Sequence, residues 1–244
     1  SGMERLGQNF RLMCNKRYAR QLILPEIGPD GQKRLAEASV LIVGLGGLGT
    51  PAATYLTGAG VGRIGLCDHD TVGLANLQRQ TLYTEAEIGL PKTECARKRL
   101  SAMSAHTVFD TYPRGLLHEN ARGIIRRYDI VIDCCDNFAT RYLIDDSCYA
   151  ESKPWVYGSI SEFGCQIAVM NGSRKLRYTS LFPCRDTLAA IPAASAGVLG
   201  TVPGVAGAIQ ANEAIKFLCG FGETLDGRLY TLDLKTLETN IFEF

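Results

Sequence analysis

Short apolar runs alternate along the chain with longer segments in which apolar residues recur at helical spacing. Runs of about four to eight residues bounded by turn residues are typical of strands. The runs that fit this pattern cover residues 39–43, 63–67, 107–112, 129–133 and 154–158. Helical patterns separate them, over residues 47–59, 92–103, 118–127 and 138–150. This alternation predicts βαβ units and therefore a mostly parallel sheet.

The pattern changes towards the carboxyl terminus. Two apolar runs, at 165–170 and 175–181, flank the dipeptide Asn171-Gly172, which is typical of a β-hairpin turn. The stretch 184–197 is rich in Ala, Pro and Ser and has no clear periodicity, so we expect a mobile loop there. A helix rich in Ala and Gly and a final pair of strands follow, at residues 202–219, 228–232 and 236–242.

A basic segment lies ahead of the first strand. It is predicted to be helical over 12–21, and a turn at 28–31 separates it from a short helix at 32–38. Together the elements predict an α/β fold: a Rossmann-like, mostly parallel sheet with helices on both faces, extended by antiparallel strands in its carboxyl-terminal part. We expect a single domain over residues 1–244, with an N-terminal helical segment and two halves at about residues 10–38, 39–158 and 159–244.

Composition limits the classes of partner. The chain has 244 residues, of which 46% are hydrophobic and 21% charged, as expected for one compact domain. A net charge of +1 gives no electrostatic reason to expect nucleic acid or an anionic membrane as a partner. The sequence contains no secretion signal and no apolar run of membrane-spanning length, so we expect a cytoplasmic protein.

The nine cysteines form no recognisable disulfide or metal pattern. Their number is odd, they are widely scattered, and no two are spaced as Cys-x-x-Cys. The three histidines do not cluster with them. We therefore predict no structural zinc site. The adjacent pair Cys134-Cys135 is interpreted as packing at the end of a strand rather than as a redox site.

A glycine-rich turn between the first strand and the next helix is the strongest candidate for ligand binding. Its glycines are Gly44, Gly46, Gly47 and Gly49. Such turns let backbone N–H groups approach phosphate, and the helix amino terminus adds favourable partial charge. Asp68, at the end of the second strand, is either a ribose acceptor or a cap of that strand's end. Enzymes that use NAD, FAD or ATP share this pattern.

Charged residues beyond the turn favour triphosphate chemistry over hydride transfer. Arg79 follows in the run 76–80, and Lys92 stands at the predicted start of a helix, where a cation and free N–H groups can clamp phosphate. The alternative for Lys92 is a solvated surface lysine. Asp136 lies just past the fourth strand, where a carboxylate facing phosphate suggests Mg²⁺. The same position also suits the N-cap of the next helix.

Six motifs occur in order along the chain: Arg17-Tyr18-Ala19-Arg20-Gln21, Gly44-x-Gly46-Gly47-x-Gly49, Asp68-x-Asp70, Asn76-Leu77-Gln78-Arg79-Gln80, Gly89-x-Pro91-Lys92 and Asp133-x-x-Asp136-Asn137. Together they resemble the ThiF/MoeB/HesA family, the bacterial relatives of ubiquitin-activating enzymes. The resemblance extends over nearly the whole chain, from about residue 17 to residue 242.

The resemblance implies a homodimeric adenylyltransferase. Such an enzyme uses ATP and Mg²⁺ to activate the C-terminal glycine of a small ubiquitin-like sulfur-carrier protein that ends in Gly-Gly, giving an acyl-adenylate and pyrophosphate. It also implies that the second half, about residues 159–244, binds the carrier, with a cysteine desulfurase or another sulfur donor as a further partner. The choice of carrier and pathway (thiamin, molybdopterin, cysteine or another) stays open.

The resemblance also assigns roles to single residues. The catalytic set is Arg20, Arg79, Lys92 and Asp136. Arg20 is supplied in trans across the dimer, and Asp136 serves the metal and the reacting carboxylate. The other nucleotide-binding positions are Gly44, Gly46, Gly47, Gly49, Asp68, Asp70, Asn76, Gln80 and Asn137. Because the attacking carboxylate is already ionised, the reaction needs no general base, only alignment and neutralisation of phosphoryl charge.

Two features depart from the family pattern. Many members hold structural zinc with two Cys-x-x-Cys pairs, but Arg177-Tyr178-Thr179-Ser180 stands in place of the first pair and the sequence ends near the second. Some members carry a cysteine in the loop before Ala196-Gly197-Val198, where this chain has Ala193. Cys184, at the beginning of the same loop, is the candidate to replace it.

Three alternatives stay open. A nicotinamide-dependent oxidoreductase fits the glycine turn and Asp68 but gives Arg79, Lys92 and Asp136 no role. A dehydratase acting on threonylcarbamoyl-adenosine in tRNA keeps the family, but the near-neutral charge counts against it. A non-catalytic subunit that only recruits a ubiquitin-like protein does not need the phosphate-contacting residues.

Overall fold

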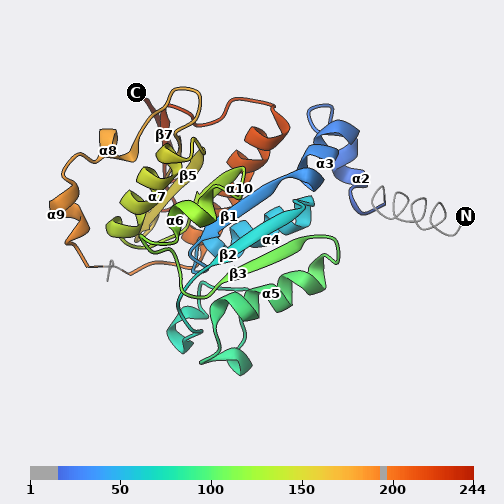
Figure 1. Cartoon of the computed structure of the whole chain (residues 1–244), viewed down its shortest axis with the longest axis horizontal. Helices are drawn as coiled ribbons and strands as arrows, with labels where there is room; N and C mark the ends of the chain where they lie inside the picture. The colour runs from blue at the N-terminus through green and yellow to red at the C-terminus, as the bar shows by residue number, and fades with distance from the viewer. Residues whose placement is uncertain (1–15, 193–196) are drawn as a thin grey trace, which may run out of the picture.

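The computed structural model describes residues 16–192 and 197–244, which share one eight-stranded sheet (Figure 1). The strands lie in the order β3-β2-β1-β4-β5-β6-β7-β8. Those that pair parallel are β1 (Ser39–Val43), β2 (Arg63–Cys67), β3 (Val108–Tyr112), β4 (Ile130–Asp133) and β5 (Trp155–Ser161). Antiparallel pairing adds β6 (Gly164–Met170), β7 (Arg228–Asp233) and β8 (Glu238–Glu243). The predicted fold class is confirmed.

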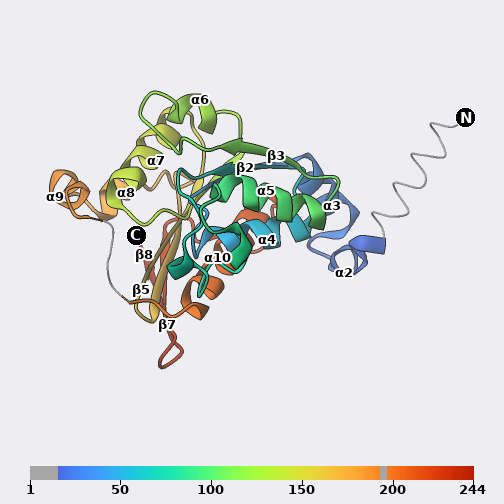
Figure 2. The ribbon, with the colours of Figure 1, turned by 90° about the horizontal axis from the view of Figure 1, so that it is seen from below.

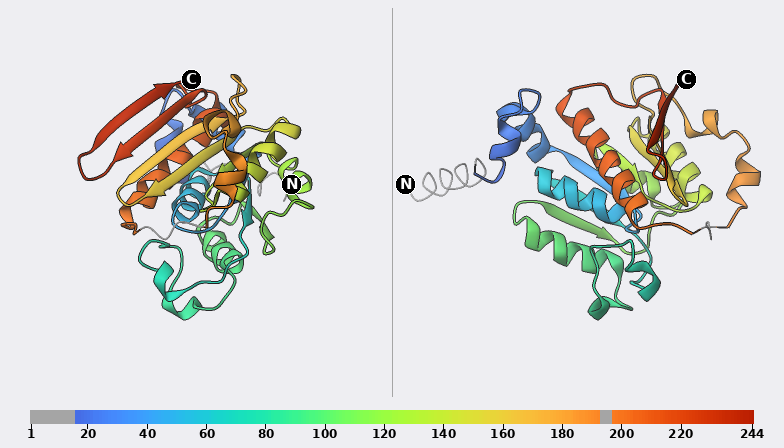
Figure 3. Two further views of the ribbon diagram at one scale, coloured as in Figure 1. Left: turned by 90° about the vertical axis from the view of Figure 1, so that its left-hand side faces the viewer. Right: turned by 180° about the vertical axis from the view of Figure 1, so that it is seen from behind.

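Helices cover both faces of the sheet. On one face α4 (Gly49–Ala59), α5 (Lys92–Met103) and α10 (Thr201–Cys219) lie side by side, as the view from behind shows (Figure 3). On the other lie α6 (Ala121–Ile125) and α7 (Phe138–Ala150). β1 is buried on both sides, because Val40 and Ile42 pack with the first group while Leu41 and Val43 pack with the second. A strand buried on both faces is a continuous apolar run, so the sequence predicts its bounds correctly.

Two short helices precede the sheet, α2 (Ala19–Leu22) and α3 (Gly28–Glu37). They lie at the opposite end of the molecule from α8 (Tyr178–Leu181) and α9 (Arg185–Ala189) (Figures 1 and 2). The predicted turn at 28–31 is wrong, because these residues form the first turn of α3. Pro29 fits there, since the first N–H groups of a helix have no intrahelical partner.

The predicted hairpin around Asn171-Gly172 is also wrong. β6 pairs with β5 on one side and with β7 on the other, so it has no free edge for residues 175–181. Part of that stretch forms α8 instead, where the Tyr178 N–H donates to the buried carboxylate of Asp145. Asn171 does adopt a turn conformation, with φ of +51°. Its side-chain amide, however, donates to the carbonyl oxygens of Cys148, in the last turn of α7, and of Lys153, which follows α7.

The stretch 184–197 was expected to be a mobile loop, and its first part is a helix. Residues 185–189 form α9, and the Arg185 guanidinium donates to Asp146 of α7 at 2.6 Å. Ala193 and Ala196, which bear on the missing loop cysteine, lie outside the described residues. Two 3₁₀ turns, η1 (Leu74–Asn76) and η2 (Glu85–Glu87), lie between β2 and α5. Within residues 16–192 and 197–244, every helix is too short or too polar to cross a bilayer.

The carboxyl ends of β2, β1 and β4 lie next to one another at one edge of the sheet. The chain continues from β1 to β2 and β3 on one side and later to β4 and β5 on the other. Open α/β sheets bind their ligands at such a switch point, outside the carboxyl ends of the strands. We therefore expect a ligand site at this edge.

Candidate functional site

The glycine-rich turn joins β1 to α4, and close packing requires its glycines. Gly44 has φ of +96°, and a Cβ there would lie 2.5 Å from the carbonyl oxygen of Cys134, which follows β4. A Cβ on Gly49 would overlap the carbonyl oxygen of Gly44. The turn is thus held against the end of β4 by backbone contacts that a side chain would break.

Gly46 and Gly47 leave backbone donors available for a ligand. In the part of the chain that the structure describes, their N–H groups have no hydrogen-bond acceptor. They immediately precede α4, whose amino-terminal dipole favours negative charge. Pro203 of α10 closes one side of the turn, 2.9 Å from the place a Cβ on Gly47 would take. The turn can therefore bind an anion such as phosphate through its backbone.

Asp68 fixes the shape of this turn. Its carboxylate accepts hydrogen bonds from the N–H of Leu45 at 2.6 Å and from the N–H of Asp70 at 2.8 Å. The residue is only 9% exposed. The interpretation of Asp68 as a cap of the strand end is confirmed. Each carboxylate oxygen keeps a further lone pair, so Asp68 can also accept from a ligand hydroxyl.

Lys92 is buried at the start of α5. Its side chain is 5% exposed, and its Nζ donates to Oδ2 of Asp70 at 3.0 Å. The surface-lysine interpretation is therefore wrong. An ammonium group has three donors, so two remain for a ligand.

The side chains of Asp68, His69 and Asp70 lie close enough to share a cation, with ligand atoms within 4.8 Å of one another. Lys92 already supplies positive charge to Asp70, and Asp68 already accepts two N–H groups. The two carboxylates therefore have hydrogen-bond and ion-pair partners without a metal.

Gln80 places a buried amide beside the turn. It is 3% exposed, and its Nε2 lies 3.5 Å from the place a Cβ on Gly46 would take. Its Oε1 has no hydrogen-bond partner. A buried polar atom without a partner is rare in folded proteins and indicates the place of a polar ligand or water.

Arg79 and Asn76 precede Gln80 in the same segment. The Cδ of Arg79 lies 3.6 Å from the place a Cβ on Gly47 would take, and its guanidinium donates to the carbonyl of Ala75 at 3.0 Å. The Asn76 side chain accepts from the N–H of Gly73 at 3.0 Å. The structure thus brings the predicted run 76–80 against the glycine turn.

Asp136 follows β4 at the same edge of the sheet. The N-cap of α7 is Asn137, whose side chain accepts from the N–H of Thr140 at 2.9 Å. The N-cap interpretation of Asp136 is therefore wrong. Its carboxylate is exposed and accepts from the Asn137 amide at 3.3 Å, so it is available to a cation.

Sequence reasoning missed two buried polar residues that hold the end of β4. Arg141 of α7 pairs with the buried Asp133 at 3.2 Å and donates to the Cys135 carbonyl at 2.9 Å. Burial lowers the pKa of Arg141, but Asp133 and other neighbouring groups together raise it above the ordinary value, so the guanidinium stays charged. Gln210 of α10 donates to the Asp133 carbonyl at 2.6 Å. A polar residue among the apolar positions of a helix is the signal that could have revealed each.

Seven of the eight described cysteines are buried. Burial raises the pKa of the Cys134 and Cys135 thiols well above the ordinary value, so neither is an activated nucleophile and the packing interpretation is confirmed. Cys184 is exposed and immediately precedes α9. Arg177, at the place of the family's first zinc pair, instead donates to Asp145 of α7 at 2.9 Å. The absence of zinc stays a prediction.

Arg20 is not brought to this edge within one chain. It is exposed on α2, and its neighbour Gln21 donates to the carbonyl of Ala59. Tyr18 packs close to Gly60, which ends α4. These contacts lie at the far end of α4, whose 11 residues span about 16 Å. Arg20 of the same chain therefore lies away from the glycine turn.

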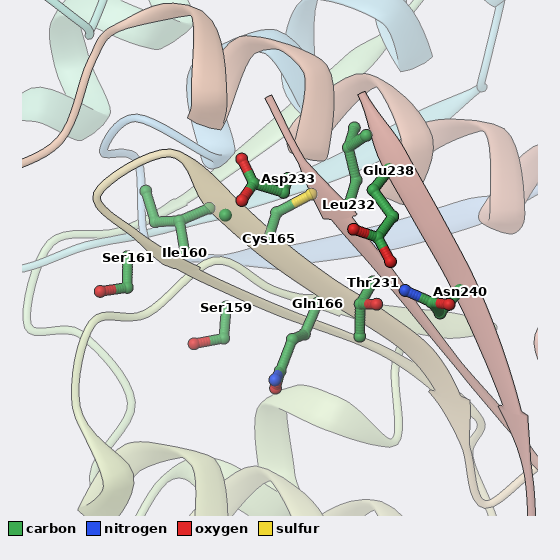
Figure 4. A pocket seen from close by; sticks show the side chains of 11 residues that line it. Ser159, Ile160, Ser161, Cys165, Gln166, Thr231, Leu232, Asp233, Glu238 and Asn240 are labelled. Carbon is green, nitrogen blue, oxygen red and sulfur yellow. The ribbon is translucent and has the colours of Figure 1, made fainter. Parts of the chain in front are cut away.

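A hollow of about 390 Å³ lies on the antiparallel strands (Figure 4), and none of the residues that line it belongs to the glycine turn. Strands β5 to β8 all contribute to it. Most of the side chains around it are polar, among them Ser159, Gln166, Thr231, Asp233, Glu238 and Asn240. The hollow belongs to the half of the chain at 159–244 that was expected to bind a partner.

Comparison with known proteins gives a family and close relatives. The family model described as the ThiF family matches residues 18–244. The chain is similar to the sulfur carrier protein adenylyltransferase of Thermus thermophilus, at 46% identity over 223 residues, which covers 89% of this chain and 82% of that protein. It is also similar to the adenylyltransferase and sulfurtransferase MOCS3 of Drosophila virilis, at 48% identity over 219 residues. That match covers 89% of this chain and 48% of the relative, so the chain spans about half the length of MOCS3.

Solved structures share the fold at low sequence identity. The complex of E. coli MccB with MccA-N7isoASN has a TM-score of 0.81 at 20% identity, covering 94% of this chain and 71% of that one. PaaA has a TM-score of 0.79 at 21% identity, covering 94% and 73%. These likenesses establish the fold alone.

Proposed function

Because the chain belongs to the ThiF family, we propose that it is an ATP-dependent adenylyltransferase that activates the C-terminal glycine carboxylate of a small ubiquitin-like sulfur-carrier protein. The names of its relatives at 46% and 48% identity, both adenylyltransferases, support this. One observation carries the proposal: donors and an unsatisfied amide gather at the glycine turn, namely the N–H groups of Gly46 and Gly47, the Gln80 side chain and the buried Lys92.

These groups fit ATP. The turn, Lys92 and Arg79 supply the N–H and cationic donors that a triphosphate needs. Asp68 accepts from ribose hydroxyls, while Asn76 and Gln80 orient the nucleotide. Asp70 holds the Lys92 ammonium group in place at 3.0 Å.

Mg²⁺ is the metal we propose at Asp136. The carboxylate of Asp136 is exposed and has only an amide donor from Asn137, and carboxylate oxygens are ligands that Mg²⁺ prefers. A Mg²⁺ ion held by Asp136 would supply positive charge that offsets the negative charge of the phosphates. Asn137, by capping α7, fixes the residue that precedes it.

The reaction depends on alignment rather than on proton transfer. The glycine carboxylate is ionised at neutral pH, so one of its oxygens attacks the α-phosphorus of ATP directly. A new P–O bond forms, the bond to the oxygen that bridges to the β-phosphorus breaks, and pyrophosphate leaves with that oxygen. Arg79 and Lys92 neutralise the charge on the phosphoryl oxygens.

The functional unit is a homodimer in which Arg20 serves the site of the other subunit. The place of Arg20 at the far end of α4, away from the turn of its own chain, supports this. Exposed apolar side chains on α4 and α10 offer a surface for a second copy: Tyr55, Val205 and Phe217.

The carrier binds the half of the chain at 159–244, where the hollow on β5 to β8 lies. A cysteine desulfurase or another sulfur donor acts on the activated carrier. The pathway, thiamin, molybdopterin, cysteine or another, is set by which carrier is accepted. A cytoplasmic location stays a prediction from the sequence.

The test is ATP–pyrophosphate exchange. The purified protein is mixed with Mg²⁺, ATP, labelled pyrophosphate and each diglycine-ended carrier candidate in turn. We expect carrier-dependent exchange with one of them and no exchange with a carrier that lacks the final glycine. Thermal stabilisation by NAD but not by ATP with Mg²⁺ would contradict the proposal, as would ATP turnover that depends on tRNA.

A further inference from the structure

We propose that Tyr83 is a positioning residue that aims the Gly46 N–H at the phosphates of ATP, an inference that rests on the proposed function. The Tyr83 hydroxyl donates to the carbonyl oxygen of Leu45 at 2.8 Å. The N–H of Leu45 donates to Asp68 at 2.6 Å. Side chains from outside the turn therefore hold both polar groups of Leu45.

The geometry of the peptide bond turns this contact into control of a donor. The carbonyl of Leu45 and the N–H of Gly46 belong to one planar trans peptide, so they point in opposite directions. Fixing the carbonyl fixes the direction of the N–H. The Gly46 N–H is one of the two turn donors that have no acceptor in the described ranges.

Burial makes the contact a permanent one. Tyr83 is 6% exposed, and both burial and the charge of Asp68 raise the pKa of its phenol. The hydroxyl therefore stays protonated, and remains a hydrogen-bond donor, at neutral pH. The Leu45 carbonyl lies where water does not replace a lost donor, since Leu45 is fully buried.

Tyr83 also ties the turn to the segment that carries Arg79. The Tyr83 N–H donates to the Gln80 carbonyl at 3.2 Å, and the Gln80 N–H donates to the Asn76 carbonyl at 2.9 Å. The Gln80 side chain in turn reaches Gly46. Tyr83 thus links the glycine turn, through its hydroxyl, to the segment that carries Arg79 and Gln80, through its backbone N–H.

The experiment compares Tyr83→Phe with a matched control. Tyr142→Phe removes the same kind of bond, from a buried phenol to the Phe182 carbonyl at 2.7 Å, away from the turn. We expect Tyr83→Phe to raise the Kd of ATP with Mg²⁺ in calorimetry, and its KM, by about tenfold. The kcat of exchange and the KM of the carrier should change less than about twofold. The lost interaction holds ATP equally in the ground state and in the transition state, so its loss weakens ATP binding without slowing the chemical step. Tyr142→Phe should leave the Kd of ATP unchanged.

Each other outcome overturns the inference. Equal ATP affinity in the wild type and Tyr83→Phe would remove Tyr83 from positioning while leaving the proposed function intact. Loss of ATP affinity in both variants, in proportion to their loss of Tm, would make the role merely structural. A wild type that binds no ATP and exchanges with no carrier would refute the proposed function itself.

Discussion

The buried ammonium group of Lys92 is a fixed positive charge that lies 3.0 Å from Asp70, one of the carboxylates that follow β2. We expect Lys92→Ala to lower the rate of ATP–pyrophosphate exchange by about 100-fold or more, because losing one preorganised donor to developing charge costs about 10²–10³ in rate. Stability should change little, since Asp70, which loses its partner, is 55% exposed. Exchange rates at saturating ATP and thermal unfolding measure the two effects.

Lys98 provides the matched control on the same helix, because its side chain is exposed on α5. Lys98→Ala removes the same charge from the protein and should leave exchange unchanged. Equal losses in the two variants would mean that net charge, and not the position of Lys92, governs the rate.

Asp136 differs from Lys92 in lying exposed, so its substitution separates chemistry from folding. Asp136→Asn keeps the shape of the side chain and leaves the Asn137 cap of α7 in place. We expect the Mg²⁺ concentration for half-maximal exchange to rise by about tenfold or more, because a neutral amide is a weaker ligand for this cation. Tm should stay the same. An unchanged Mg²⁺ dependence would remove Asp136 from metal binding.

Local pattern predicts which residues gather at the site, but not which groups they contact. Asp68, the glycines and Asp136 follow strands directly, so their place at the carboxyl edge follows from the parallel sheet. The burial of Lys92 depends on Asp70, 22 residues earlier. The Tyr83 contact with Leu45 spans 38 residues. Such long-range pairs leave no periodic trace in a single sequence.

Among the elements, α10 packs unusually close to the glycine turn, and Gly207 makes this possible. A Cβ on Gly207 would overlap the Leu48 carbonyl oxygen. We expect Gly207→Ala to push α10 from the turn, lower stability by about 1–3 kcal/mol as overpacking does, and weaken ATP binding. Gly58→Ala, in α4, meets nothing within 4 Å and should stabilise by about 0.5–1 kcal/mol. Thermal unfolding and ATP titration of both variants check this, and a harmless Gly207→Ala would contradict it.

The segment from α8 to α9 is held to α7 by ion pairs that Arg177 and Arg185 form with Asp145 and Asp146. Arg177 pairs at 2.8 Å with Asp145, which is fully buried, and at 2.9 Å with Asp146. We expect Arg177→Met to lower the free energy of unfolding by about 3–5 kcal/mol, because it leaves a buried carboxylate without its partner. Denaturant unfolding measures the change. Arg114→Met breaks an exposed pair with Glu119 and should cost less than about 1 kcal/mol.

The bounds of a strand or helix can be predicted where local sequence determines them, but not where two distant segments could pair with the same strand edge. The strands at 39–43 and 63–67 have the predicted bounds because four of the five residues of each are buried. The helix at 92–103 is only partly buried, and its start is predicted because Pro91 stands directly before it. The hairpin at 171–172 fails for another reason. Residues 228–233, far along the chain, take the edge of β6 that the hairpin would have used. Asn171 keeps the positive φ of a turn residue, but the strand that pairs with β6 is determined by tertiary contacts.

At the scale of the whole molecule, one continuous sheet joins the glycine turn to the strands that carry the hollow. β5 pairs with β4 on the nucleotide side and with β6 on the other. α10 crosses the same boundary: it packs on the turn through Pro203 and on the end of β4 through Gln210. The sheet and the contacts of α10 therefore continue across residue 158, where the two proposed roles divide.

The same geometry makes the proposed dimer testable by mixing two inactive variants. Arg20→Ala lacks the arginine supplied to the partner, and Asp136→Ala lacks the carboxylate of its own site. If Arg20 acts in trans, a mixed dimer contains one complete site, formed by Asp136 of the first chain and Arg20 of the second. When subunits redistribute at random, about half of the dimers are mixed, and each mixed dimer has one complete site of two. The rate of ATP–pyrophosphate exchange should therefore recover to about a quarter of the wild-type rate. Each variant alone should stay inactive. If Arg20 instead served its own chain, neither site of the mixed dimer would be complete, and unfolding and refolding the mixture together would restore nothing.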